Sequence, residues 1–161
     1  MWTTMPSPIG DLRLVESGGA LAGIDFSPWK APLDAADKGM CDVLVQAVAQ
    51  LEGYFAGELR EFDLPLALAG TPFQQRVWRE LLHVGYGTTA TYGQVAARLG
   101  LPIGAARAIG AANARNPVPV VVGCHRVIGA NGSLTGYAGG LDRKRYLLDL
   151  EASGLQPGLY A

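Results

Sequence analysis

One short run in the second half of the chain combines three residue types that support nucleophilic chemistry, Cys124, His125 and Arg126. A cysteine is nucleophilic only as its thiolate, and a neighbouring cation or histidine base favours that form. The apolar run 118–122 lies just before Cys124 and is typical of a buried strand. The pattern predicts a reactive thiol at the end of a buried segment. An inert buried cysteine beside a core histidine fits the same residues.

A carboxylate that would complete this group occurs at Glu151. In a predicted helix it falls on the same face as Leu147 and Leu148. A carboxylate that points inward needs a partner, because burying it unpaired is costly. His125 is one of only two histidines in the chain, so a Cys-His-Glu relay is an economical pairing. An exposed Glu151 near a frayed helix end is the alternative.

Composition excludes several other classes of protein. Two cysteines and two histidines without close spacing do not form a zinc site, and no Walker or dinucleotide motif is present. No apolar run approaches the ~20 residues that cross a bilayer, and the first residues lack the layout of a secretory signal. We therefore expect a protein without a metal or membrane segment, with free thiols, in the cytoplasm (associated with the nucleoid if the source is bacterial).

The net charge of −1 hides an asymmetry along the chain. Up to Gly70 there are four basic and ten acidic residues, whereas from Thr71 onward there are nine basic and four acidic ones. Lys and Arg make the phosphate contacts of DNA-binding proteins. The second half is therefore the one that could face a nucleic acid, although ordinary variation in surface charge gives the same count.

The elements that must position Cys124 divide into two modules of an α+β fold. In the first, 1–69, apolar alternation on both sides of Ser17-Gly18-Gly19 predicts a β-hairpin. A helix follows, whose apolar stripe consists of Leu44, Val48, Leu51 and Phe55. The stretch 57–70 is either a strand or a connector into the second module.

The second module, 70–152, is predicted to be mainly helical. Two capping-box patterns, 71–74 and 91–94, each open a helix, and the second of these should end at Gly100. After a turn at 101–104, a third helix is expected over 105–115. Two short helices joined by a tight turn that contains glycine suggest a helix-turn-helix.

Seven of the eleven residues of the helix over 105–115 are alanine or glycine, and Arg107 is the side chain expected to project from it. Such a thin helix either packs tightly on a neighbouring helix or enters a narrow groove of a ligand. The residues alone leave both interpretations open.

The last part of the module carries two turn signals and a helix. Asn131-Gly132 predicts a tight hairpin between 127–128 and Leu134, and the glycine-rich loop 136–140 could line a pocket. A final helix is expected over 142–151, and residues 153–161 are expected to form a tail.

From Gly70 to Glu151 the chain closely resembles the O6-alkylguanine-DNA alkyltransferases, also called methylated-DNA–protein-cysteine methyltransferases. The motifs appear in the family's order and cover about half the chain. They are Gly70-Thr71-Pro72-Phe73-Gln74 with Val77-Trp78, Tyr92-Gly93-Gln94, Ala106-Arg107-Ala108-Ile109-Gly110, Asn116-Pro117, Cys124-His125-Arg126-Val127 and Gly136-Tyr137-Ala138-Gly139-Gly140. The first module fits the family more loosely and is ribonuclease H-like by this resemblance.

The resemblance implies single-turnover repair of O6-alkylguanine in DNA, with O4-alkylthymine as a further candidate substrate. Cys124 would attack the alkyl carbon of a flipped-out base and keep the alkyl group as a thioether. His125 and Glu151 would take the thiol proton through a water, and Asn116 would brace this network. Tyr92 would donate toward guanine N3. No cofactor or metal is implied.

The resemblance also implies how a monomer would hold double-stranded DNA. Arg107 would fill the space left by the flipped base, and the thin helix, with Ala106 and Gly110, would enter the minor groove, whose degenerate code suits repair that ignores sequence. Arg126 would be a further DNA contact. The base pocket would be walled by Val127, Tyr137, Ala138 and Gly139.

Two features depart from the family's pattern. Gly123 stands where the family usually has proline, and glycine loosens the backbone that holds the nucleophile. The 101–104 turn is one residue longer than in many relatives, which could tilt the helix that carries Arg107. Two alternatives therefore remain: an alkyltransferase-like protein that binds the lesion without transfer, and a cysteine hydrolase with a Cys-His-Glu relay.

Overall fold

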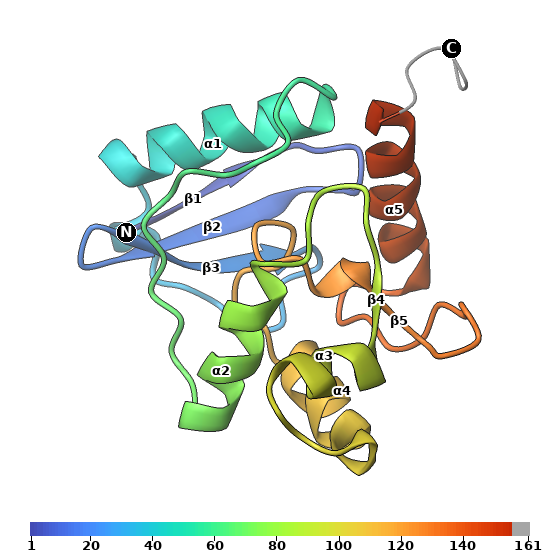
Figure 1. Cartoon of the computed structure of the whole chain (residues 1–161). Coiled ribbons are helices and arrows are strands. Elements are labelled where there is room, and N and C mark those ends of the chain that lie inside the picture. The colour runs from blue at the N-terminus through green and yellow to red at the C-terminus, as the bar shows by residue number, and fades with distance from the viewer. Residues whose placement is uncertain (156–161) are drawn as a thin grey trace. The chain divides into compact units, whose positions relative to one another are not determined.

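The structure, a computed structural model, describes residues 1–155 and consists of two compact units that divide between Ala69 and Gly70 (Figure 1). The first unit is an antiparallel three-stranded sheet with one long helix. The second is mainly helical with a two-stranded parallel sheet. The predicted α+β fold class is confirmed.

The sheet of the first unit has the strand order β1-β2-β3, with β1 over Trp2–Met5, β2 over Leu12–Ser17 and β3 over Ala20–Phe26. The predicted hairpin is β2–β3, in which Leu14 lies opposite Ile24. Strand β1 was not predicted. Helix α1, Asp42–Phe55, packs on all three strands and buries Leu44 and Leu51 against them. A short 3-10 helix, η1, spans Ala35–Asp37.

The stretch 57–70 is a connector, with a single bridge between Leu21 and Leu66. The helices of the second unit follow it. They are α2 (Pro72–Leu81), α3 (Tyr92–Arg98), the 3-10 helix η2 (Ile103–Ala105), α4 (Ala106–Ala114), the 3-10 helix η3 (Cys124–Arg126) and α5 (Leu141–Leu155).

Both predicted capping boxes are present. Thr71 caps α2 and Thr91 caps α3, each accepting a hydrogen bond from the backbone N–H three residues later. The glutamine at that third position, Gln74 or Gln94, returns a hydrogen bond to the capping residue's own N–H. These reciprocal bonds satisfy N–H groups that a helix start leaves free, so the sequence locates both helix starts correctly.

Helices α3 and α4 form the predicted helix-turn-helix, and α4 packs against both α2 and α3. The indole N–H of Trp78 in α2 donates to the carbonyl of Ala112 in α4 at 2.8 Å, which requires a close approach of the two helices. The small residues therefore serve tight packing on one face of α4. On the opposite face Arg107, Ala108 and Ala111 are exposed.

The run 118–122 is not the strand that its apolar residues predict. The N–H of Val122 donates to the carbonyl of Val118 at 2.9 Å, which closes a turn, and Val120 has a φ of 73°. A β-branched residue with positive φ is strained and cannot continue an extended strand. The segment is nevertheless buried, so the apolar run in the sequence indicated burial correctly and the strand wrongly.

The turn at Asn131-Gly132 forms, with Gly129 N–H donating to the carbonyl of Ser133 at 2.9 Å, but no hairpin surrounds it. Strand β5, Val127–Ile128, instead pairs in parallel with β4, Ala90–Thr91. Parallel pairing joins segments far apart in sequence, which turn signals do not reveal.

Helix α5 extends to Leu155, so residues 153–155, expected in the tail, are helical. The rest of that predicted tail, 156–161, lies outside the described residues. Within residues 1–155 no single helix is long and apolar enough to cross a membrane, and only the bent pair α3 with 103–114 meets the requirement, by length and composition alone.

Candidate active site

The 3-10 turn η3 places Cys124, His125 and Arg126 side by side inside the second unit. Their residues are 3%, 0% and 7% exposed. The turn is held by the N–H of Cys124 donating to Val122 at 2.7 Å and by that of Arg126 donating to Gly123 at 3.0 Å. The nucleophile is therefore fixed by backbone hydrogen bonds on both sides.

Glu151 on α5 lies at the centre of a buried network and is itself 1% exposed. Its Oε2 is 2.6 Å from Nε2 of His125 and 3.0 Å from Nη2 of Arg126, and its Oε1 accepts from Nε of Arg126 at 2.9 Å. The backbone N–H of Gly87 also donates to Oε1, at 3.1 Å. The structure thus brings Glu151 and His125 together and surrounds the carboxylate with donors.

Arg126 is turned into the protein, unlike the DNA contact that its place in the motif suggested. Besides its two bonds to Glu151 it donates from Nη1 to the carbonyl of Val84 at 2.7 Å, and its guanidinium lies 6.0 Å from the centre of the Tyr86 ring. A guanidinium whose donors are directed at buried acceptors is not placed to bind a phosphate. Arg126 holds Glu151 instead.

These contacts set the protonation of the pair. Burial raises the pKa of Glu151, but hydrogen bonds and charges from His125 and Arg126 outweigh it and hold that pKa well below its usual range. Burial also lowers the pKa of His125, an effect that Glu151 only partly offsets. At neutral pH the site therefore holds an ionised carboxylate and a neutral imidazole.

An ionised carboxylate only accepts hydrogen bonds, so Nε2 of His125 carries the ring proton toward Glu151. Its Nδ1 is then a proton acceptor, and within residues 1–155 this buried atom has no hydrogen-bond partner. A neutral imidazole with one nitrogen oriented by a carboxylate and the other unoccupied is the arrangement of a general base.

The thiol of Cys124 needs such a base. Burial raises its pKa to about 11, although hydrogen bonds from Asn116 and Tyr137 and the charge of Lys144 act in the opposite direction. At neutral pH Cys124 is a thiol, and its reactivity depends on groups that remove its proton at the moment of reaction.

Two asparagines hold the backbone that leads to Cys124. Asn116 donates from Nδ2 to Val122 at 2.9 Å and accepts at Oδ1 from the N–H of Val118 at 3.0 Å, so its side chain closes the strained turn. Asn113, which the sequence analysis missed, is buried and donates to the carbonyl of Cys124 at 3.2 Å. Its position four residues after Ile109 places it on the buried face of α4, and this spacing could have indicated its burial.

Tyr92, the first residue of α3, donates from its hydroxyl to the carbonyl of Thr135 at 3.2 Å. Gly110 of α4 lies against its ring, because a Cβ there would be 3.6 Å from Cε1 of Tyr92. The structure therefore brings these two predicted residues together. Ala106 is half-buried and Arg107 is exposed on the same helix.

The predicted base-pocket residues lie on two segments. Val127 is fully buried in β5, while in the glycine-rich loop Tyr137 and Gly139 are half-buried and Ala138 is exposed. The loop is tied to the start of α5, because Arg143 donates to the carbonyl of Gly139 at 3.1 Å. Tyr137 lowers the pKa of the Cys124 thiol, so its side chain belongs to the surroundings of the nucleophile.

Lys144 of α5 was also missed by the sequence analysis. Its residue is 0% exposed, and its ammonium group donates to the carbonyl of Val127 at 2.6 Å and to that of Thr135 at 2.8 Å. Its spacing from Leu147 and Glu151 places all three residues on one helical face, and this spacing could have indicated that Lys144 points inward. A lysine in a polar stretch of sequence is ordinarily exposed to solvent, so the burial of Lys144 was not predicted from its residue type.

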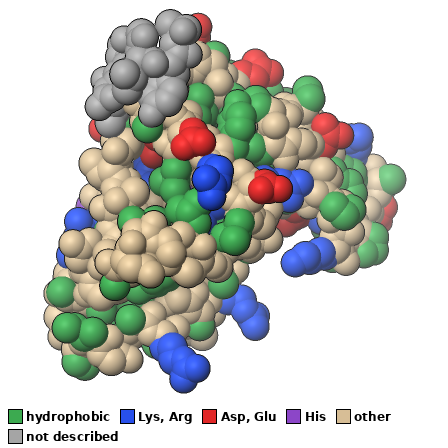
Figure 2. Space-filling view, turned by 90° about the vertical axis from the view of Figure 1, so that its right-hand side faces the viewer, with side chains coloured by type: hydrophobic (Ala, Val, Ile, Leu, Met, Phe, Trp, Pro, Cys, Tyr) green, Lys and Arg blue, Asp and Glu red, His purple; other side chains and the backbone are tan. Residues whose placement is uncertain are grey.

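One part of the second unit carries basic side chains with few acidic ones. On the face in Figure 2, Lys and Arg side chains project at the lower end, at the height of α3 and α4 in Figure 1, and no acidic side chain is visible there. Over 71–115 the chain has five arginines and a single acidic residue, Glu80. This part of the unit is electrostatically suited to a polyanion.

Models of two protein domains match nearly the whole chain. Residues 72–153 match the DNA binding domain of 6-O-methylguanine DNA methyltransferase, and residues 1–68 match its ribonuclease-like domain. A methylated-DNA–protein-cysteine methyltransferase from Mycolicibacterium paratuberculosis is 62% identical over 155 residues, covering 93% of this chain and 91% of the relative. One from Bacillus subtilis, described as constitutive, is 42% identical over 156 residues, covering 93% and 94%.

Solved structures agree with these matches. Mycobacterium tuberculosis OGT, in a crystal structure with DNA, is 49% identical with a TM-score of 0.85, covering 95% of this chain and 93% of that one. An O6-methylguanine DNA methyltransferase from Methanococcus jannaschii is 28% identical with a TM-score of 0.66, covering 88% of each chain. By its domains, its relatives and its fold, the chain belongs to the 6-O-methylguanine DNA methyltransferase family.

Proposed function

We propose that this protein repairs DNA by direct reversal, moving an alkyl group from O6 of guanine to the sulfur of Cys124. One observation carries the proposal: the thiol of Cys124, a neutral His125 and an ionised Glu151 are buried together in a unit that matches a DNA-binding domain. Relatives at 42–62% identity carry the name methylated-DNA–protein-cysteine methyltransferase, which describes this reaction.

The reaction begins with the proton of Cys124. It passes through a bridging water to Nδ1 of His125, and Glu151 stabilises the imidazolium that forms. The thiolate attacks the alkyl carbon in line with the C–O bond. A carbon–sulfur bond forms, the C–O bond breaks, and its electron pair leaves with guanine O6. Tyr92 turns its hydroxyl from Thr135 to guanine N3 and assists departure of the base.

The product thioether has no leaving group that water can displace readily, so each molecule acts once. A Cys-His-Glu hydrolase would instead release its acyl group and turn over. The exposed Arg107 and basic α3–α4 region, which hydrolysis does not require, favour transfer from DNA.

The DNA contact is proposed to be the minor groove of double-stranded DNA, bound by a monomer. The exposed face of α4 carries Ala108 and Ala111, which allow the backbone to approach a narrow groove, and Arg107, which can fill the space of a flipped base. Flipping is required because an O6 substituent is hard to reach within the base stack.

The proposal is tested with duplex DNA that contains one O6-methylguanine. The intact mass of the protein should increase by one methylene when S–H becomes S–CH3, and the DNA should lose the same mass. Cys124→Ala should bind the duplex and show no increase. If the parent protein binds the lesion tightly and neither mass changes, the protein is a lesion-binding member of the family.

A further inference from the structure

Lys144 is a buried cation without a matching anion. Its residue is 0% exposed, and both acceptors of its ammonium group are neutral carbonyls, those of Val127 and Thr135. Among residues 1–155 no carboxylate forms an ion pair with it. Lysine is almost never fully buried unless paired, because burying an isolated charge is costly. An anion close to Lys144 would compensate this charge.

The charged groups around Cys124 show which one. Arg126 and His125, from the same turn, both bond Glu151 of α5, so that carboxylate is already matched. Asn113, Asn116 and the phenol of Tyr137 are neutral. Among residues 1–155, the buried cation of the site that forms no ion pair is Lys144, from the buried face of α5, and its charge favours the ionised form of Cys124. A thiolate on Cys124 would be the missing partner.

The two acceptors of Lys144 lie in two segments that follow the nucleophile in the chain. Val127 follows η3 directly, and its N–H donates to the carbonyl of Cys124. Thr135 precedes the glycine-rich loop, and its carbonyl also accepts from Tyr92. When Tyr92 donates to a base instead, Lys144 still satisfies this carbonyl. The loop can therefore keep its place while the tyrosine changes partner.

We infer that Lys144 is a positioning residue of the transfer reaction, an inference that rests on the proposed function. Its ammonium group is the resident counter-ion of the Cys124 thiolate, and it anchors the Thr135 carbonyl when Tyr92 turns to the base. It acts through Cys124 and Thr135 and does not itself contact the alkyl group.

The thiolate part is tested without DNA. In a Cys41→Ser background, which leaves Cys124 as the reactive thiol, the rate of modification by iodoacetamide is followed by intact mass between pH 6 and 9. An opposite charge within ~4–6 Å changes an acid's ionisation constant by about 10- to 1000-fold. Lys144→Met and Lys144→Gln should therefore react at least about tenfold more slowly, with the rise in rate displaced to higher pH. Lys144→Arg should restore most of the rate.

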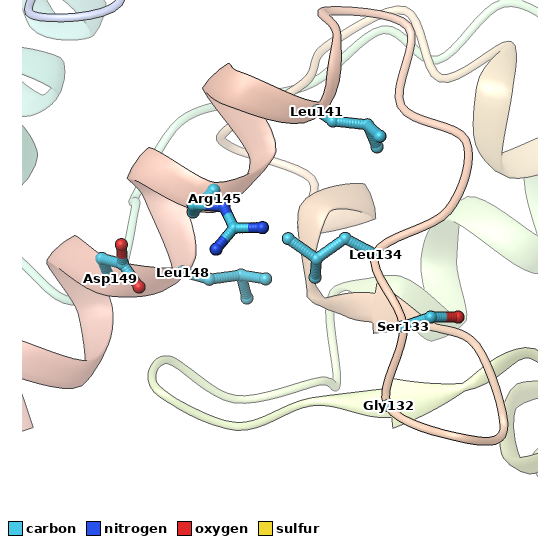
Figure 3. A pocket seen from close by; sticks show the side chains of 7 residues that line it. All are labelled: Gly132, Ser133, Leu134, Leu141, Arg145, Leu148 and Asp149. Carbon is cyan, nitrogen blue, oxygen red and sulfur yellow. The ribbon is translucent and has the colours of Figure 1, made fainter.

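Two controls separate this role from a structural one. Arg145→Met removes a cation from the next position of α5, where Arg145 lines a surface pocket with Leu134, Leu148 and Asp149 on the outer side of the helix (Figure 3). It should react within about twofold of the parent. Thermal unfolding reports which variants fold. If Lys144→Met does not fold, the rate of Lys144→Gln, which keeps an N–H donor for the carbonyls, tests the counter-ion role.

Parent-like reactivity of Lys144→Gln, or equal slowing by Arg145→Met, would overturn the inference. The loop part predicts that Lys144→Met, which has no donor for the Thr135 carbonyl, also transfers methyl groups from DNA more slowly than its thiol reactivity alone explains. Because iodoacetamide reports on the thiol without DNA, a parent protein that fails to accept methyl groups would refute the proposed function and leave the counter-ion result standing.

Discussion

Oε2 of Glu151 lies 2.6 Å from Nε2 of His125, with both side chains almost wholly buried. This contact fixes which imidazole nitrogen carries the proton, and it leaves Nδ1 to accept one. Arg126 and the N–H of Gly87 hold the same carboxylate from other directions, so its orientation is determined by three groups. The general base, His125, is therefore already oriented in the absence of substrate.

Glu151→Gln should destabilise the second unit by roughly 3–5 kcal/mol, because removing one partner leaves a buried guanidinium uncompensated. Denaturant unfolding with a probe in this unit measures the loss. Asp149→Asn, an exposed carboxylate on the same helix, is the matched control and should change stability by less than about 0.5 kcal/mol. Equal stability of the parent and Glu151→Gln would show that the network contributes little.

Acid should destabilise the second unit through His125. The pKa of His125 is lowered in the folded state, so the unfolded chain binds a proton near the ordinary value of 6.5 when the folded protein does not. Stability is therefore present above pH 6.5 and falls as the pH decreases below it. Glu151, whose pKa is also lowered, adds a further loss as the pH falls through 4.5.

The measurement is the free energy of unfolding at pH 7.5, 6 and 5. His125→Gln should flatten the dependence over this range, whereas His83→Gln, at an exposed position, should retain it. A parent protein equally stable at pH 7.5 and 5 would contradict the assignment of a neutral buried imidazole.

Gly123 should tolerate no side chain without disturbing Arg126. A Cβ there would lie 2.9 Å from Cδ and 3.1 Å from Nη1 of Arg126, whose guanidinium is held by Glu151 and Val84. The φ of −71° at Gly123 would suit the proline that the family usually has, so space and not backbone angle is decisive here.

Gly123→Ala is expected to cost roughly 1–2 kcal/mol of stability by overpacking and to slow alkyl transfer. Gly104→Ala, where nothing lies within 4 Å of the added Cβ, is the control for stability. Unchanged or improved transfer by Gly123→Ala would mean that Arg126 yields at little cost.

Arg107→Ala should slow transfer from duplex DNA much more than transfer from a single strand carrying the same O6-methylguanine. The exposed side chain is proposed to fill the space of the flipped base, and a single strand has no stack to restore. Since unstacking costs a few kcal/mol, a loss of about 10- to 100-fold on the duplex is expected. Single-turnover rates on both substrates measure it, and equal losses on the two would contradict the role.

Local signals predicted much of the fold. The capping residues Thr71 and Thr91 determine hydrogen bonds within four residues of themselves, which is why both helix starts could be predicted. The turn around Val120 could not be predicted, because valine ordinarily avoids a positive φ. The hydrogen bonds of Asn116 and the surrounding core hold it in this conformation.

The candidate site shows the same division. The helical spacing of Glu151 relative to Leu147 indicated an inward carboxylate, and the structure places it against His125. Lys144 follows the same spacing, but a buried lysine runs against the ordinary preference of its residue type. Arg126 was misplaced because its inward direction depends on Val84, which is distant in sequence.

The most direct test of the account is the location and number of methyl groups after incubation with a tenfold excess of duplex DNA containing O6-methylguanine. Peptide mass spectrometry should find one methyl group per protein, on Cys124, with the half-buried Cys41 unmodified and the remaining lesions unrepaired. Methylation of Cys41 in place of Cys124, or repair of several lesions by each protein molecule, would contradict a self-consuming transfer to Cys124.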